Sequence, residues 1–102
     1  MGQGIVIVWE FFVREGCEGE FETVYGAHGD WALLFARSGD YLGTELLRDA
    51  AAPRRYLTLD RWTTAASFEQ LWKSCSAEYA ALDARCEAWT EKESKLGVWT
   101  VP

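Results

Sequence analysis

The segment from Arg55 to Trp62 (RYLTLDRW) contains the residues of this chain that are best suited to chemistry. Side chains alternate between the two faces of a strand, so Tyr56, Thr58, Asp60 and Trp62 should share one face. A carboxyl group that is held away from water beside an indole has a raised pKa and can act as a general base. The alternative for Asp60 is an ion pair with a nearby arginine, Arg48, Arg55 or Arg61.

Aromatic residues are the second chemical signal, since the chain has 6 Trp and is 15% aromatic. If Trp62 faces the helices, Trp9 and Phe11 on the first strand can join it, and the helices can close a slot from the other side with Trp31, Phe35, Phe68, Trp72 and Tyr79. Such a slot would bind a planar ligand. The alternative is that these rings only fill the core, which is the commoner role of aromatic residues at helical spacing.

The residues that usually bind metals are sparse. His28 is the only His and lies in a Gly-rich stretch, where it is either a solvated turn residue or a contact at the mouth of a pocket. The 3 Cys include no CxxC pair, which fits neither a disulfide framework nor a zinc site. Cys75 and Cys86 are expected to be buried thiols. We therefore expect no metal, flavin or haem cofactor.

Length and charge limit the classes of function. A chain of 102 residues is expected to form a single domain, residues 1–102, around one core. The formal net charge of −6 argues against a nucleic-acid partner, because nucleic-acid binders collect Lys and Arg on one face. No apolar run is long enough to span a membrane, and the first residues lack the basic region of a secretory signal. We expect a cytoplasmic protein.

The first half of the chain predicts a strand, a broken helix and a second strand. Residues 5–13 (IVIVWEFFV) are β-branched and aromatic, which is typical of a strand. Apolar residues then follow helical spacing over residues 17–37, interrupted by glycines at 26 and 29, with Asp30 expected to cap the second segment. Residues 41–48 and 55–62 read as two strands of a hairpin around a loop containing Pro53.

The second half predicts another helix and a last strand. Thr63 and Thr64 offer an N-cap, and the apolar stripe runs to about Lys92 with a break near residues 74–76. Residues 96–101 (LGVWTV) read as the fourth strand. The order is βαββαβ, which indicates an α+β, ferredoxin-like fold with a four-stranded antiparallel sheet.

One face of this sheet should need a partner. The right-handed crossover rule places both helices on the same face. The other face is apolar, with Val6, Val8 and Phe12 on the first strand and Leu57 and Leu59 on the third. We expect a second copy of the chain to cover it, as a homodimer. Glu10 and Glu45 are expected to be inner-face carboxylates that pair with an Arg across the dimer.

Three segments together resemble the antibiotic biosynthesis monooxygenase (ABM) domain family: VIVWEFFVREGCEGEFETVYGAHGDWALLF, YLGTELLRD and RRYLTLDRWTTAASFEQLW. The likeness spans nearly the whole chain and rests on the order of aromatic and Gly positions. It implies a dimeric α/β barrel in which two ferredoxin-like subunits pack sheet to sheet. It also implies a ligand pocket between the helices and the sheet of each subunit.

The family's known activities are cofactor-independent oxygenation of aromatic polyketides and haem degradation. Trp62 matches the Trp that ends the third strand in both groups. Thr58 and Phe68 stand where the polyketide-oxidising members have Asn and Tyr. Trp9 stands where the haem-degrading members have Asn, and near Trp72 this chain lacks their iron-binding His, so haem degradation is not expected.

Two functions follow from the resemblance. The first is a cofactor-independent monooxygenase for a quinol or polyketide-like aromatic, in which Trp62 positions the ring and Asp60 or Tyr79 moves the proton. Its pocket would include Trp9, Phe11, Trp31, Phe35, Tyr56, Thr58, Phe68 and Trp72. The second is a dimeric binding or stress-related module that holds a small aromatic ligand without converting it.

Overall fold

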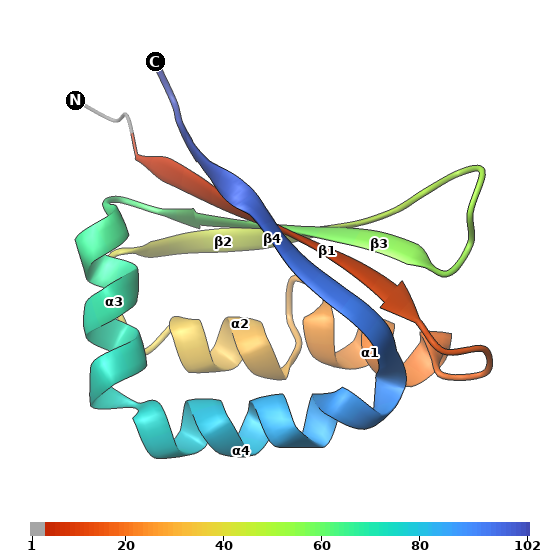
Figure 1. Cartoon of the computed structure of the whole chain (residues 1–102). Coiled ribbons are helices and arrows are strands. Elements are labelled where there is room, and N and C mark those ends of the chain that lie inside the picture. The colour runs from red at the N-terminus through yellow and green to blue at the C-terminus, as the bar shows by residue number, and fades with distance from the viewer. Residues whose placement is uncertain (1–3) are drawn as a thin grey trace.

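The structure is a computed structural model, and it describes residues 4–102. Four strands, β1 (Ile5–Val13), β2 (Tyr41–Arg48), β3 (Arg55–Trp62) and β4 (Thr90–Thr100), form one antiparallel sheet in the order β2-β3-β1-β4. The helices α1 (Glu18–Tyr25), α2 (Asp30–Phe35), α3 (Ala65–Ser74) and α4 (Ser76–Cys86) lie on one side of that sheet (Figure 1). This confirms the α+β, ferredoxin-like architecture expected from the sequence.

Both predicted helix breaks occur. The first separates α1 from α2 at Gly26 to Gly29, where a Cβ on Gly29 would lie 2.3 Å from the backbone oxygen of Val24. Asp30 does not cap α2, because Gly29 occupies the N-cap and the Asp30 carboxylate accepts a 2.7 Å hydrogen bond from Arg85. The cap that the sequence predicted at Thr64 is present as a reciprocal capping box with Ser67.

The predicted end of the last helix is wrong. The helical stripe was expected to reach Lys92, but α4 ends at Cys86, and a short 3₁₀ turn η1 (Glu87–Trp89) leads into β4. Residues 90–95 have a polar composition that does not favour a strand. They pair with β1, opposite Trp9 to Val13, so tertiary pairing decides their conformation.

The inner face of the sheet packs against the helices. Buried residues of the core alternate along the central strands: Ile7, Phe11, Val13, Tyr56, Thr58, Asp60 and Trp62. Phe21 and Tyr25 of α1 stack with ring centroids 4.1 Å apart and cover this face. Leu71 and Leu82 extend the cover from α3 and α4.

The outer face carries the apolar residues that the sequence assigned to it. Val8 lies opposite Leu59, and Leu47 lies opposite Leu57, so these side chains share a face. Leu47 is 42% and Trp99 51% exposed in the single chain. These residues form a broad apolar surface with no helix over it (Figure 1).

Glu10 and Glu45 were expected on the inner face, and that expectation is wrong. Glu10 lies opposite Leu57 and Glu45 opposite Leu59, which places both carboxylates on the outer face. Within the chain, Glu10 pairs with Arg55 at 2.6 Å and Glu45 pairs with Arg61 at 3.3 Å.

No helix in residues 4–102 is long and apolar enough to cross a membrane.

Candidate active site

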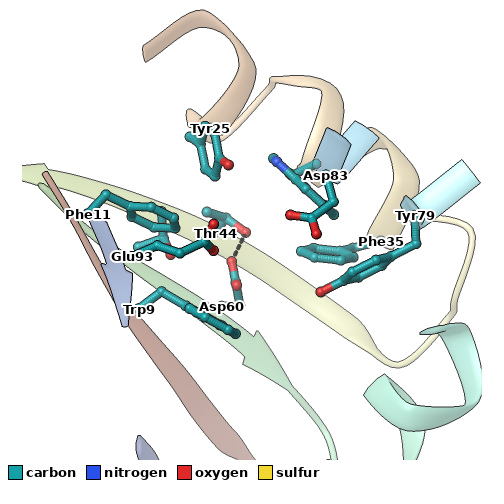
Figure 2. A pocket seen from close by; sticks show the side chains of 11 residues that line it. Trp9, Phe11, Tyr25, Phe35, Thr44, Asp60, Tyr79, Asp83 and Glu93 are labelled. Carbon is teal, nitrogen blue, oxygen red and sulfur yellow. Dashed lines mark hydrogen bonds between the residues drawn. The ribbon is translucent and has the colours of Figure 1, made fainter. Parts of the chain in front are cut away.

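A cavity of about 110 Å³ lies between the inner face of the sheet and the helices (Figure 2). It is lined by side chains from every strand and from α1, α2 and α4: Trp9, Phe11, Tyr25, Trp31, Phe35, Thr44, Thr58, Asp60, Tyr79, Asp83 and Glu93. Its lining contains six aromatic side chains and three carboxyl groups.

The apolar walls come from two elements that meet across the cavity. Alternation along β1 directs Trp9 and Phe11 to the inner face, where their rings lie 6.4 Å apart. The turn between α1 and α2 places Trp31 and Phe35 opposite them, with centroids 5.7 Å apart. All four had been predicted to line a pocket, and the structure brings them together.

Asp60 provides the buried carboxyl group of the cavity. Its side chain is 9% exposed, and the Thr44 hydroxyl donates a 2.7 Å hydrogen bond to Oδ1. Thr44 in turn lies 2.6 Å from the Tyr41 hydroxyl. Burial raises the pKa of Asp60 to about 6, and the Thr44 hydrogen bond opposes that rise. Asp60 is therefore a weak acid that is still mostly ionised at neutral pH.

The alternative role for Asp60, an ion pair, is not found among residues 4–102. Each candidate partner is engaged elsewhere: Arg48 with Glu22, Arg55 with Glu10 and Asp49, and Arg61 with Glu45. Asp60 thus faces the cavity without a cation beside it.

Tyr79 and Tyr25 bring hydroxyl groups to the same space (Figure 2). Burial, with the charges of Asp83, Asp60 and Glu93, raises the pKa of Tyr79 to about 12. Burial is also the main cause of a raised pKa at Tyr25. Both phenols stay protonated at neutral pH and can donate hydrogen bonds to a ligand.

Asp83 and Glu93 also line the cavity. Asp60 is buried, whereas these two residues are accessible to solvent, which places them at the outer part of the cavity. Partial desolvation at the cavity raises the pKa of Glu93, and the charges of Asp83 and Glu87 add to the effect. Neither residue was expected at the site from the sequence, nor were Tyr25 and Thr44. Glu93 was not expected because the sequence pattern did not indicate that β4 begins as early as Thr90. Asp83 could have been found from helical spacing, because it lies four residues after Tyr79 on α4 and so shares its face.

Four residues expected at the site lie outside the cavity lining. Trp62 is on the inner face but fully buried behind it, with its ring 5.5 Å from Phe35 and 5.2 Å from Tyr41. Phe68 packs on Trp62 from α3. The Tyr56 hydroxyl donates to Glu22, and its ring packs on Phe21. Trp72 is 46% exposed on α3.

The residues with metal-binding potential are dispersed. His28 is exposed in the turn between α1 and α2. All 3 cysteines are free thiols, with Cys75 and Cys86 buried as expected and Cys17 half-buried. In the part of the chain that the structure describes, no group of three or more His, Cys, Asp or Glu side chains could hold a metal ion.

Solved structures share this fold. SnoaB from Streptomyces nogalater, a cofactor-independent oxygenase, superposes with a TM-score of 0.77 at 22% identity, over 99% of this chain and 95% of that one. A protein of Bordetella bronchiseptica assigned to the antibiotic biosynthesis monooxygenases gives 0.67 at 22% identity, over 96% and 94%. One of Nitrosomonas europaea with the same assignment gives 0.68 at 13%, over 99% and 88%.

The chain has the fold of the antibiotic biosynthesis monooxygenase domain. The resemblance seen in the sequence is thereby confirmed at the level of architecture. No protein-family model and no curated protein matches the chain. At identities of this size a shared fold does not establish a shared activity, so function has to be argued from the cavity.

Proposed function

We propose that this protein is a cofactor-independent monooxygenase that oxidises an electron-rich aromatic compound, such as a quinol or an aromatic ring system with an acidic methylene group. The observation that carries the proposal is Asp60, a buried carboxyl group without an ion pair that opens into an aromatic cavity. The shared fold with SnoaB, itself a cofactor-independent oxygenase, supports it.

The chemistry needs only substrate, oxygen and a base. Asp60 removes a proton from the substrate carbon, and the resulting carbanion transfers electrons to O₂ to form a peroxide. The peroxide takes a proton and then loses water, which leaves a carbonyl group at that carbon. One oxygen atom enters the product and the other leaves as water. The substrate carbon supplies all four electrons of the reduction, two when the peroxide forms and two when the peroxide loses water.

The cavity residues divide these tasks. Asp60, with a pKa of about 6, is ionised at neutral pH and accepts the proton. Tyr79 stays protonated and can donate to the peroxide oxygen. Trp62 does not line the cavity, and we propose that it positions the ring by supporting Phe35 from behind. The aromatic walls exclude water from the carbanion.

The size of the cavity limits the substrate. Its volume of about 110 Å³ is somewhat below that of an engineered cavity of about 150 Å³ that binds benzene. The cavity therefore has room for at most one ring of the substrate. A larger ring system has to extend through the mouth, past Asp83 and Glu93.

The second candidate function is a small-ligand-binding module without turnover. It is favoured by Thr58, a cavity residue, and by Phe68, because the polyketide-oxidising members that this chain resembles have polar Asn and Tyr there. In that case the cavity binds aromatic ligands, and Asp60 serves as a hydrogen-bond acceptor.

We further propose a homodimer that forms through the outer face of the sheet. Val8, Leu57 and Leu59 are central on this face and have no helix over them. Two such faces packed together would remove an apolar surface from water, which is the main driving force of stable association. The ion pairs of Glu10 and Glu45 with arginines border the apolar surface on β1, β2 and β3.

Oxygen uptake with a panel of anthrone-like and hydroquinone compounds tests the enzyme proposal. We expect uptake with at least one compound, in the absence of added metal or flavin, and a loss of uptake in Asp60→Asn. Glu69→Gln, a change at an exposed residue of α3, is the matched control and should retain activity. Binding of the same compounds without uptake would favour the binding module instead.

A further inference from the structure

The charged residues that line the cavity are all acidic. Its lining contains Asp60, Asp83 and Glu93 but no Lys, Arg or His. Within residues 4–102, none of the three forms an ion pair. Every charge that shifts the pKa of Tyr79 belongs to one of these carboxylates. An anionic ligand would therefore enter against a repulsive field.

The deepest of the three carboxylates is incompletely satisfied. Asp60 is 9% exposed, and the hydrogen bond from Thr44 reaches only Oδ1. Among the described residues, Oδ2 has no hydrogen-bond donor. A carboxylate that is buried without a counter-charge is costly, so a ligand that brings positive charge or a donor into the cavity would be stabilised there.

The walls suit the same kind of ligand. The faces of aromatic rings attract cations, with Trp and Tyr ahead of Phe. Trp9 and Tyr79 are half-buried at the cavity, close to the carboxylates of Asp83 and Glu93 (Figure 2). Asp83 and Glu93 both line this cavity, and the charge of Asp83 raises the pKa of Glu93.

We propose that the cavity selects aromatic amines: the ring packs among Trp9, Phe11 and Phe35, and the protonated amino group lies between Asp83 and Glu93. This inference concerns the charge of the ligand and goes beyond the proposed oxidation, since it holds whether or not the ligand is converted. If the ligand is oxidised, its ammonium group also lowers the cost of forming a carbanion next to three carboxylates.

Three probes with one ring and different charges test the proposal by titration calorimetry at low salt. They are tyramine, a cation; tyrosol, its neutral alcohol; and 4-hydroxyphenylacetate, an anion of similar size. We expect tyramine to bind roughly threefold to tenfold more tightly than tyrosol, as for one or two partly exposed ion pairs. 4-Hydroxyphenylacetate should bind most weakly, and added salt should reduce these differences.

The variant with both Asp83→Asn and Glu93→Gln should lose the preference for tyramine while still binding tyrosol. Asp83 is half-buried and Glu93 is exposed, so the fold should tolerate the changes, and Glu69→Gln should leave the preference intact. Three outcomes would overturn the inference. They are binding of 4-hydroxyphenylacetate that equals or exceeds that of tyramine, a preference for tyramine that persists in the double variant, and no binding of any probe at millimolar concentration. A clear amine preference without oxygen uptake by any panel compound would overturn the proposed oxidation alone.

Discussion

The Thr44 hydroxyl donates a 2.7 Å hydrogen bond to Asp60 Oδ1 across the ladder between β2 and β3. This pairing depends on a bulge. The register of β2 shifts between Tyr41 and Gly43, and Gly43 has a φ of 135°, which is readily adopted only by glycine. Because of the extra residue, Thr44 rather than Gly43 lies opposite Asp60, so Asp60 receives a hydrogen-bond donor, and Glu45 lies on the outer face.

The buried Asp60 should make stability depend on pH. Its pKa rises from 3.8 in the unfolded chain to about 6 in the fold, so the folded chain holds the proton more tightly and loses stability as pH rises through this window. The full penalty above pH 6 is about 3 kcal/mol. Asp60→Asn should therefore melt at a higher temperature than the wild type at pH 8 but not at pH 4. Calorimetry at both pH values checks this, and an identical pH profile in both proteins would contradict it.

Removal of the Thr44 hydroxyl should raise the pKa of Asp60 further. Thr44→Val keeps the shape of the side chain but removes the hydrogen bond that favours the carboxylate. The acidic limb of the pH–rate profile should move to higher pH, with little change in the maximal rate. Thr23→Val, at an exposed position of α1, is the control. A limb that stays in place would show that Asp60 is not the titrating group.

Trp62→Ala should destabilise the chain by about 3–5 kcal/mol, since the indole is fully buried among Phe35, Tyr41 and Phe68. Phe35 loses its support, so binding of planar aromatic ligands should weaken at the same time. Urea unfolding and ligand titration measure the two effects. The mass in solution should not change, and dissociation of the assembly in this variant would contradict the assignment of Trp62 to the inner face.

Leu57→Glu and Leu59→Glu should each prevent self-association, because both place a carboxylate at the centre of the apolar outer face. Light scattering should give about twice the chain mass of 11.6 kDa for the wild type and 11.6 kDa for soluble, folded variants. Leu33→Glu, at a position 67% exposed on the helical side, is the control and should remain dimeric. A wild type with the mass of a single chain would overturn the dimer proposal.

The sequence by itself determined the bounds of three strands and the two helix breaks. It also determined the face of most residues on β1 and β3, with Glu10 as the exception. The bounds of β1, β2 and β3 agree with the predicted ones, because their β-branched and aromatic runs end at clear turn residues. Alternation then sufficed to place Trp9, Phe11, Thr58 and Asp60 on one face, and all four line the cavity.

Only the tertiary structure decided the rest of the site. The bulge at Gly43 reverses the alternation that would bring Glu45 inward. Pairing with β1 turns the polar residues 90–95 into a strand and thereby brings Glu93 to the cavity. Trp62 shares a face with Asp60 but lies behind Phe35, outside the cavity. The alternation of residues along a strand indicates which face of the sheet a side chain lies on. How deeply the side chain is buried and which residues it contacts depend on packing between segments that are distant in the sequence.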